Sequence, residues 1–275
     1  GIQKKVNWVY GSDMSFLLLT EKQHKFDLTA GIAPVFGLQL QPATTTFSNG
    51  ARINLCAYSG ICVTLCLDHS GRNSMDNARD ARIRRTSLFR NEFPLFRAEL
   101  DRDLSHVARK HPGEAWVRLN TFSDVLWENK MGHDWFKSWE HKLAGFYDYT
   151  KWPLGKRNNL PDNYHLTYSW SERTTEQEFT DQLNAGRNVA VTMLVCTNNY
   201  KGDCRYGCHC PLPSHFKGVP VIDGDKHDAR FTEPPGHVIG LRFKRPRGDE
   251  PLQQIIDEIK RLHAEKKQSF VQIPG

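Results

Sequence analysis

Residues 188–196 read Asn-Val-Ala-Val-Thr-Met-Leu-Val-Cys. A short run that is almost entirely apolar is typical of a strand covered on both faces, as the inner strands of parallel sheets are. Directly before it, residues 175–185 predict a helix, with Ser171 or Thr174 as its cap and Gly186 at its end. A helix that leads into such a strand is half of a β/α unit.

The same alternation continues toward the amino terminus. The expected elements are a helix at 87–110, a strand at 115–119, a helix at 135–143, and strands at 146–149 and 164–169. In the first helix, Pro94 predicts a break or a new helix start. The rhythm predicts an α/β fold of parallel β/α units, with its functional site at the carboxyl ends of the strands.

The composition suits one sizeable core, because 39% of the 275 residues are hydrophobic and 25% are charged. We therefore expect a single α/β domain over residues 1–275. Its amino-terminal segment, residues 1–50, is expected to be irregular. Residues 251–268 predict an amphipathic helix near the carboxyl terminus.

The formal net charge of +6 permits a nucleic acid or nucleotide as partner without requiring one. No apolar run of about 18 residues appears, so no membrane span is expected. No secretory signal is visible, which predicts a cytoplasmic protein, in the host cell cytoplasm if a phage encodes it. The sequence does not indicate an oligomeric state.

Seven cysteines are an odd number, in a chain large enough not to need disulfides. Reduced thiols in clusters are candidate metal ligands. The first group is Cys56, Cys62 and Cys66, in a loop after a short strand at 52–56, and it predicts an iron–sulfur cluster or a zinc ion. The alternative is that these are three small residues packing a core.

The second group is Cys196, Cys204, Cys208 and Cys210, in a loop rich in Gly and Asn. Four thiolates satisfy a tetrahedral zinc site and equally a cluster site. If Cys196 belongs to the core, His209 or His215 would replace it as a ligand. A bond between two oxidised cysteines is the remaining alternative.

Four polar residues near strand ends are candidates for catalysis. Arg118 and Asn120 alternate with apolar residues, which aims both side chains to one side of a strand. Arg118 suits a carboxylate or a phosphate, Asp124 a base, and Lys151 phosphate binding or amine chemistry. The alternative is a polar network that orders the loop, with Lys151 as an ordinary surface residue.

Three stretches carry a family resemblance: Val-Arg-Leu-Asn-Thr-Phe-Ser-Asp (117–124), Phe-Tyr-Asp-Tyr-Thr-Lys (146–151) and Asn-Tyr-His-Leu-Thr-Tyr-Ser (163–169). In this order, after a cysteine-rich loop and a basic segment at 79–90, they resemble a family of poorly characterised phage and plasmid proteins. The architecture of that family looks like the partial barrel of radical S-adenosylmethionine enzymes. The resemblance covers roughly residues 25–245.

The resemblance implies an open or closed parallel β/α barrel of the radical-SAM or TIM type. Cys56, Cys62 and Cys66 would occupy the place of the cluster ligands. Two departures count against S-adenosylmethionine as a cofactor and leave a relative without a cluster open. The three cysteines are spaced more widely than in those enzymes, and Asn120–Asp124 replace the expected glycine-rich segment.

Our leading interpretation is a phage or mobile-element barrel protein with a cysteine-bound iron–sulfur or zinc centre, which acts on a nucleotide or nucleic acid. Whether it is an enzyme stays open. One alternative is a non-enzymatic nucleic-acid-binding protein with structural zinc, in which arginines contact phosphates: Arg79, Arg82, Arg84 and Arg85. Another is a magnesium-dependent hydrolase built on Asp124, Asp223 and Asp225.

Overall fold

The structure is a computed structural model. It describes residues 17–20, 29, 31–63, 75–195, 210–243, 257, 259–262, 264–265 and 271–273. Four of the seven cysteines lie outside these ranges: Cys66, Cys196, Cys204 and Cys208. Most of the helix predicted at 251–268 also lies outside them. The prediction of a single domain over the whole chain stays a prediction.

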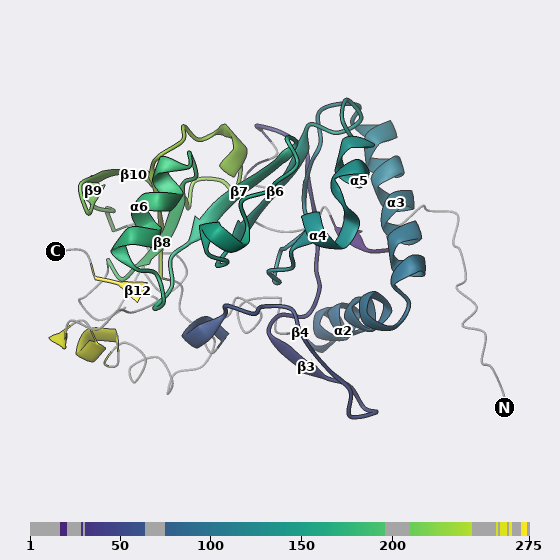
Figure 1. The fold of residues 1–275 in the computed structure, drawn as a ribbon, viewed down its shortest axis with the longest axis horizontal. Coiled ribbons are helices and arrows are strands. Elements are labelled where there is room, and N and C mark those ends of the chain that lie inside the picture. The colour runs from purple at the N-terminus through teal and green to yellow at the C-terminus, as the bar shows by residue number, and fades with distance from the viewer. Residues whose placement is uncertain are drawn as a thin grey trace.

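A ten-stranded sheet forms the centre of the fold (Figure 1). Its strands are β1 (Leu19–Thr20), β2 (Val35–Leu38), β5 (Trp116–Arg118), β6 (Gly145–Thr150), β7 (Tyr164–Ser169), β8 (Val189–Met193), β9 (His215–Phe216), β10 (Val219–Asp223), β11 (Val238–Arg242) and β12 (Val271–Gln272). Their order in space is β1-β2-β5-β6-β7-β8-β11-β10-β9, and β12 also pairs with β8. A separate hairpin joins β3 (Thr44–Thr46) to β4 (Arg52–Asn54).

The helices are α2 (Asp76–Asn91), α3 (Phe93–Lys110), α4 (Trp127–Met131), α5 (His133–Lys137) and α6 (Glu176–Asn184). Short 3-10 turns are η1 (Gly60–Val63), η4 (Leu154–Lys156) and η6 (Arg230–Thr232). The helix predicted at 87–110 is divided between α2 and α3. Pro94 lies in the first turn of α3, where its missing N–H costs no hydrogen bond. Figure 1 shows α2 and α3 at one end of the molecule and α6 at the other.

The predicted open or closed parallel β/α barrel is wrong, because the sheet is mixed and does not close within the described residues. Neighbours from β2 to β10 run parallel, but β1 and β9 are antiparallel to theirs and form the two edges. A barrel needs its first and last strands to pair. The connections also differ from a helix-rich barrel, since β6 leads to β7 through η4, and β8 leads to β11 through β9 and β10. The alternation in the sequence located strands but carried no information about closure.

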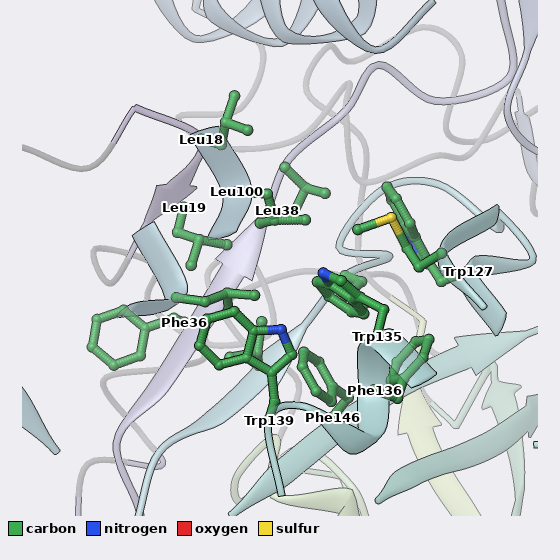
Figure 2. Close-up of a cluster of buried hydrophobic side chains, with 14 of the residues drawn as sticks. Leu18, Leu19, Phe36, Leu38, Leu100, Trp127, Trp135, Phe136, Trp139 and Phe146 are labelled. Carbon is green, nitrogen blue, oxygen red and sulfur yellow. The ribbon is translucent and has the colours of Figure 1, made fainter. Parts of the chain in front are cut away.

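The larger hydrophobic core lies between the sheet and helices α3, α4 and α5. Val117, Phe146 and Leu166, from β5, β6 and β7, point toward these helices and are almost completely buried. Figure 2 shows Trp135, Phe136 and Trp139 gathered around Phe146. A second cluster packs α6 against β8. Since side chains alternate along a strand, residues next to these core positions point to the opposite face.

That opposite face is covered near the amino ends of its strands by residues 224–233. Phe231 stacks on Trp116, with ring centroids 4.0 Å apart and an interplanar angle of 3°. Asp228 and Arg230 of this segment are completely buried. The segment thus places charged side chains against the sheet, where they contact polar residues of the strands.

None of the helices within the described residues is both long enough and apolar enough to cross a lipid bilayer.

Candidate functional site

A row of polar side chains runs along the face of β5, β6 and β7 that points away from α3, α4 and α5. Tyr149 and Thr167 are neighbours in the parallel register of β6 and β7. The guanidinium carbon of Arg118 lies 4.8 Å from the centre of the Tyr149 ring. Farther along, Lys151 Nζ donates a hydrogen bond to Ser169 Oγ at 2.8 Å. The row therefore leads toward the carboxyl edge of the sheet.

A buried group of charges closes the other end of the row. Arg118 Nη1 donates to Asp228 Oδ2 at 2.8 Å, and the Tyr147 hydroxyl donates to the same oxygen at 3.2 Å. Arg230 pairs with Glu233. Burial lowers the pKa of Arg118, but Asp228, Tyr147, Tyr149 and Asp148 together outweigh it and raise that pKa. Burial raises the pKa of Glu233 to about 7.

Several polar atoms of the row have no hydrogen-bond partner among the described residues. Three of them are Arg118 Nε, the Tyr149 hydroxyl and Thr167 Oγ1, all of which are buried. Buried polar atoms are hydrogen-bonded in the great majority of cases. These three lie on one face of neighbouring strands and have unused hydrogen-bonding capacity.

The loop that carries Cys56 and Cys62 lies against the same carboxyl edge. Cys56 Sγ donates to the carbonyl of Phe122 at 3.5 Å, and Asp124 N–H donates to the carbonyl of Leu55 at 2.7 Å. Gly60 has a φ of +50°, and a Cβ there would clash with the Glu172 carboxylate in its present position. The left-handed φ therefore favours a glycine where the loop meets the residues after β7.

The Cys62 thiol is part of this edge. Neither Cys56 nor Cys62 is in a disulfide, and both are half-buried. Burial raises the pKa of the Cys62 thiol, the Lys151 ammonium opposes that rise, and the Glu172 and Asp124 carboxylates add to it. The thiol is therefore within electrostatic reach of two of the predicted catalytic residues.

Asn120 shapes the loop that follows β5. Its Oδ1 accepts hydrogen bonds from Ser123 Oγ, the Val125 N–H and Trp127 Nε1, at 2.9 to 3.0 Å. Its Nδ2 donates to the carbonyl of Val125 at 3.0 Å. These contacts agree with the polar-network alternative for Asn120, while its predicted catalytic role stays a prediction.

Asp124 links the same loop to the end of β6. Its Oδ2 accepts from the Lys151 N–H at 2.7 Å, and its Oδ1 lies 3.2 Å from Arg157 Nη1. Burial raises the pKa of Asp124 although Arg157 opposes the change. Asp124 thus fixes the backbone from which the Lys151 side chain projects.

Sequence reasoning missed the buried cluster on the helix side of this edge. Arg157 donates to both carboxylate oxygens of Glu128, at 2.9 and 3.0 Å, and to the Tyr164 hydroxyl. Tyr164 in turn donates to Asp148 Oδ2 at 2.6 Å. Arg157 lies in a polar loop, and nothing in the local sequence indicates that it is completely buried.

The second cysteine group is mostly outside the described residues. Of its members the structure describes Cys210, whose thiol is half-buried. The backbone carbonyl of Cys210 accepts a hydrogen bond from Arg242 Nε at 2.8 Å. Arg242 also binds Asp223 and Asp225, at 2.7 and 3.2 Å. Within the described ranges no three His, Cys, Asp or Glu side chains lie close enough together to hold a metal ion. The predicted magnesium ligands Asp124, Asp223 and Asp225 are therefore not gathered into one site.

The four arginines proposed to contact phosphates do not form one surface. Arg79 and Arg84 are exposed on α2, whereas Arg82 is completely buried, with its guanidinium 5.2 Å from the centre of the Phe122 ring. Arg85 Nε donates to the carbonyl of Leu17 at 3.3 Å. Helix α2 therefore presents only part of its basic charge to solvent.

Fold and site together define a mixed-sheet protein that carries a polar row on the sheet face opposite α3, α4 and α5, with a cysteine loop at the carboxyl edge of that sheet. The chain belongs to the Gene product 88 family, whose profile matches residues 17–265. A numbered gene product is a phage-style name, in agreement with the predicted phage origin, and no finding supports the likeness to radical S-adenosylmethionine enzymes. No curated protein and no solved structure matches the chain.

Proposed function

We propose that this phage-type protein holds a cysteine-bound iron–sulfur or zinc centre at the carboxyl edge of its sheet and acts there on a nucleotide or nucleic acid. Cys56, Cys62 and Cys66 would hold the centre. When bound, a cluster would supply electron transfer, and zinc would supply a Lewis acid.

The position of Cys62 carries the proposal. Its thiol is electrostatically coupled to Lys151 and Asp124, so a centre bound there would adjoin the polar row. Arg118 and Lys151 bring positive charge to that row, and the Tyr149 and Thr167 hydroxyls bring hydrogen-bonding capacity. Cationic and hydroxyl groups together suit the phosphate of a nucleotide.

The donor set fits a soft metal. Cys56 and Cys62 are thiols in one short loop, and Cys66 follows four residues later, outside the described residues. Burial makes the Cys62 thiolate unfavourable, since it raises the pKa of the thiol. A bound cation would reverse that preference, because metal binding displaces the thiol proton.

The test is anaerobic purification followed by an absorption spectrum and elemental analysis for iron, zinc and sulfide. We expect a stoichiometric metal that is lost from C56A, C62A and C66A. The matched control is C210A, which removes a half-buried thiol from the second cysteine group. No metal in the wild-type protein, or full metal in all three variants, would contradict the centre. Zinc that is lost only from C210A would move the metal to the other group.

The substrate is tested separately by titrating a nucleoside triphosphate and a single-stranded oligonucleotide into the protein. We expect K151M to weaken binding by about tenfold, as loss of a charged hydrogen bond would. K156M is the control, because Lys156 is an exposed lysine five positions farther along. Equal affinities of K151M and K156M would remove Lys151 from the site.

A further inference from the structure

A pocket of 430 Å³ lies away from the cysteine loop, between η4 and the turn that joins α6 to β8. It opens beside Tyr164 at the beginning of β7, whereas Cys62 and Lys151 lie at the other end of the strands. Its volume is in the range of small-molecule sites. The leucines Leu154, Leu160 and Leu166 form apolar walls, and Asn158 and Arg187 are polar wall residues.

Arg187 is the unusual residue of this pocket. It is buried, with 8% of its surface exposed. Its guanidinium donates to Gln182 Oε1 at 3.2 Å and to the backbone carbonyl of Arg157. Both of these acceptors are uncharged.

Three other buried arginines have carboxylate partners. Arg118 pairs with Asp228, Arg157 with Glu128, and Arg230 with Glu233. No ion pair of Arg187 is found within the described residues. A buried charge without a counter-ion is costly, so buried charges are usually paired.

The electrostatic surroundings of Arg187 agree with a missing counter-ion. Burial, and after it the neighbouring Arg157 guanidinium, lower its pKa to about 10. The Glu128 and Glu178 carboxylates oppose this only in part. An anion in the pocket would stabilise the charged guanidinium.

The pocket also limits the kind of anion. Gly186 and Ala185, which follow the carboxyl end of α6, line it, and the carbonyls at a helix carboxyl end carry partial negative charge. This charge disfavours a multiply charged group. A guanidinium matches a carboxylate in a planar, two-pronged contact, and the leucine walls suit an aliphatic chain.

We propose that this pocket binds a small organic acid, with its carboxylate on Arg187 and its apolar chain against the leucines. None of the described residues that line the pocket belongs to the cysteine loop or to the polar row, so this proposal does not depend on the function proposed above.

The experiment compares three probes by isothermal titration calorimetry: hexanoate, hexanol and inorganic phosphate. We expect hexanoate to bind at least about tenfold more tightly than hexanol, because the carboxylate gains charged hydrogen bonds. Phosphate should bind more weakly than hexanoate. Hexanol binding as tightly as hexanoate, phosphate binding more tightly, or no binding of hexanoate would overturn the proposal.

Two pairs of variants locate the site. R187Q should lose the preference for hexanoate over hexanol, and R173Q, at an exposed arginine before α6, should keep it. N158D adds a negative charge at the pocket and N159D adds the same charge at the next residue, and both asparagines are exposed. N158D should weaken hexanoate binding more than N159D does and leave hexanol unchanged. This second pair decides the outcome if R187Q does not fold, and equal affinities in N158D and N159D would overturn the proposal.

Discussion

Arg118 Nη1 lies 2.8 Å from Asp228 Oδ2, although the two residues are 110 positions apart in the chain. This contact fastens the segment at 224–233 to β5, and both side chains are removed from solvent. Arg118 is thus a structural residue as well as a member of the polar row. Its Nη1 contacts the segment at 224–233, whereas its Nε has no hydrogen-bond partner among the described residues.

The buried pair determines what R118A should do. If Arg118 were a catalytic residue alone, R118A would abolish activity and leave folding intact. The structure instead predicts that it lowers the free energy of unfolding by about 3–5 kcal/mol, because Asp228 stays buried and loses the arginine with which it forms an ion pair. Urea unfolding followed by circular dichroism measures the change. The double variant R118M/D228L should recover part of the lost stability. If it is no more stable than R118A, the buried Asp228 carboxylate is not the main cause of the loss.

Asn120 gives a second prediction about stability. N120A removes the acceptor of three hydrogen bonds and leaves a hydroxyl, an amide and an indole N–H without it. Each unsatisfied buried group costs about 1–3 kcal/mol, so we expect a loss of at least 2 kcal/mol. The control N158A, at an exposed asparagine, should change stability by about 0.5 kcal/mol or less. Similar unfolding midpoints for the two variants would show that the hydrogen bonds of Asn120 do not stabilise the fold.

Asp148 predicts a dependence of stability on pH. Burial raises its pKa from 3.8 to about 7, although hydrogen bonds from Tyr164 and Asn120 oppose the change. The folded protein therefore retains a proton that the unfolded chain releases. This contribution to stability is complete below pH 4 and is lost as the pH rises to about 7, at up to about 1.4 kcal/mol per pH unit.

The measurement is the free energy of unfolding at pH 5 and pH 8 for the wild-type protein and D148N. An amide resembles the protonated carboxyl and does not titrate, so D148N should lose less stability across this interval than the wild type. D162N, at an exposed carboxylate, should follow the wild type. Parallel profiles for the wild type and D148N would show that Asp148 does not hold the proton.

The sequence allowed some of these relationships to be predicted and hid others. Asp124 and Lys151 each follow a strand, and neighbouring parallel strands bring such residues together, as the 2.7 Å contact from the Lys151 N–H to Asp124 shows. The partner of Arg118 could not be foreseen, because no local pattern relates positions so far apart. Likewise, the short antiparallel strands β1 and β9, which end the sheet, have only two residues each and leave no periodic signal.

The last prediction concerns the Cys62 thiol and tests whether the edge is assembled as described. In metal-free protein, the rate of iodoacetamide labelling at Cys62 should rise with pH along the titration of its thiol, since the thiolate is the nucleophile. Lys151 favours the thiolate and Glu172 disfavours it. K151M should therefore shift the labelling profile to higher pH, and E172Q should shift it to lower pH. K156M should leave it in place, because Lys156 has no part in the titration of Cys62. Mass spectrometry of the labelled peptide gives each profile. Opposite shifts in K151M and E172Q require both charges to act on the same sulfur, so they would place the cysteine loop over the end of β6. If neither variant moves the profile, Cys62 does not lie beside Lys151, and a centre bound by this loop would not adjoin the polar row.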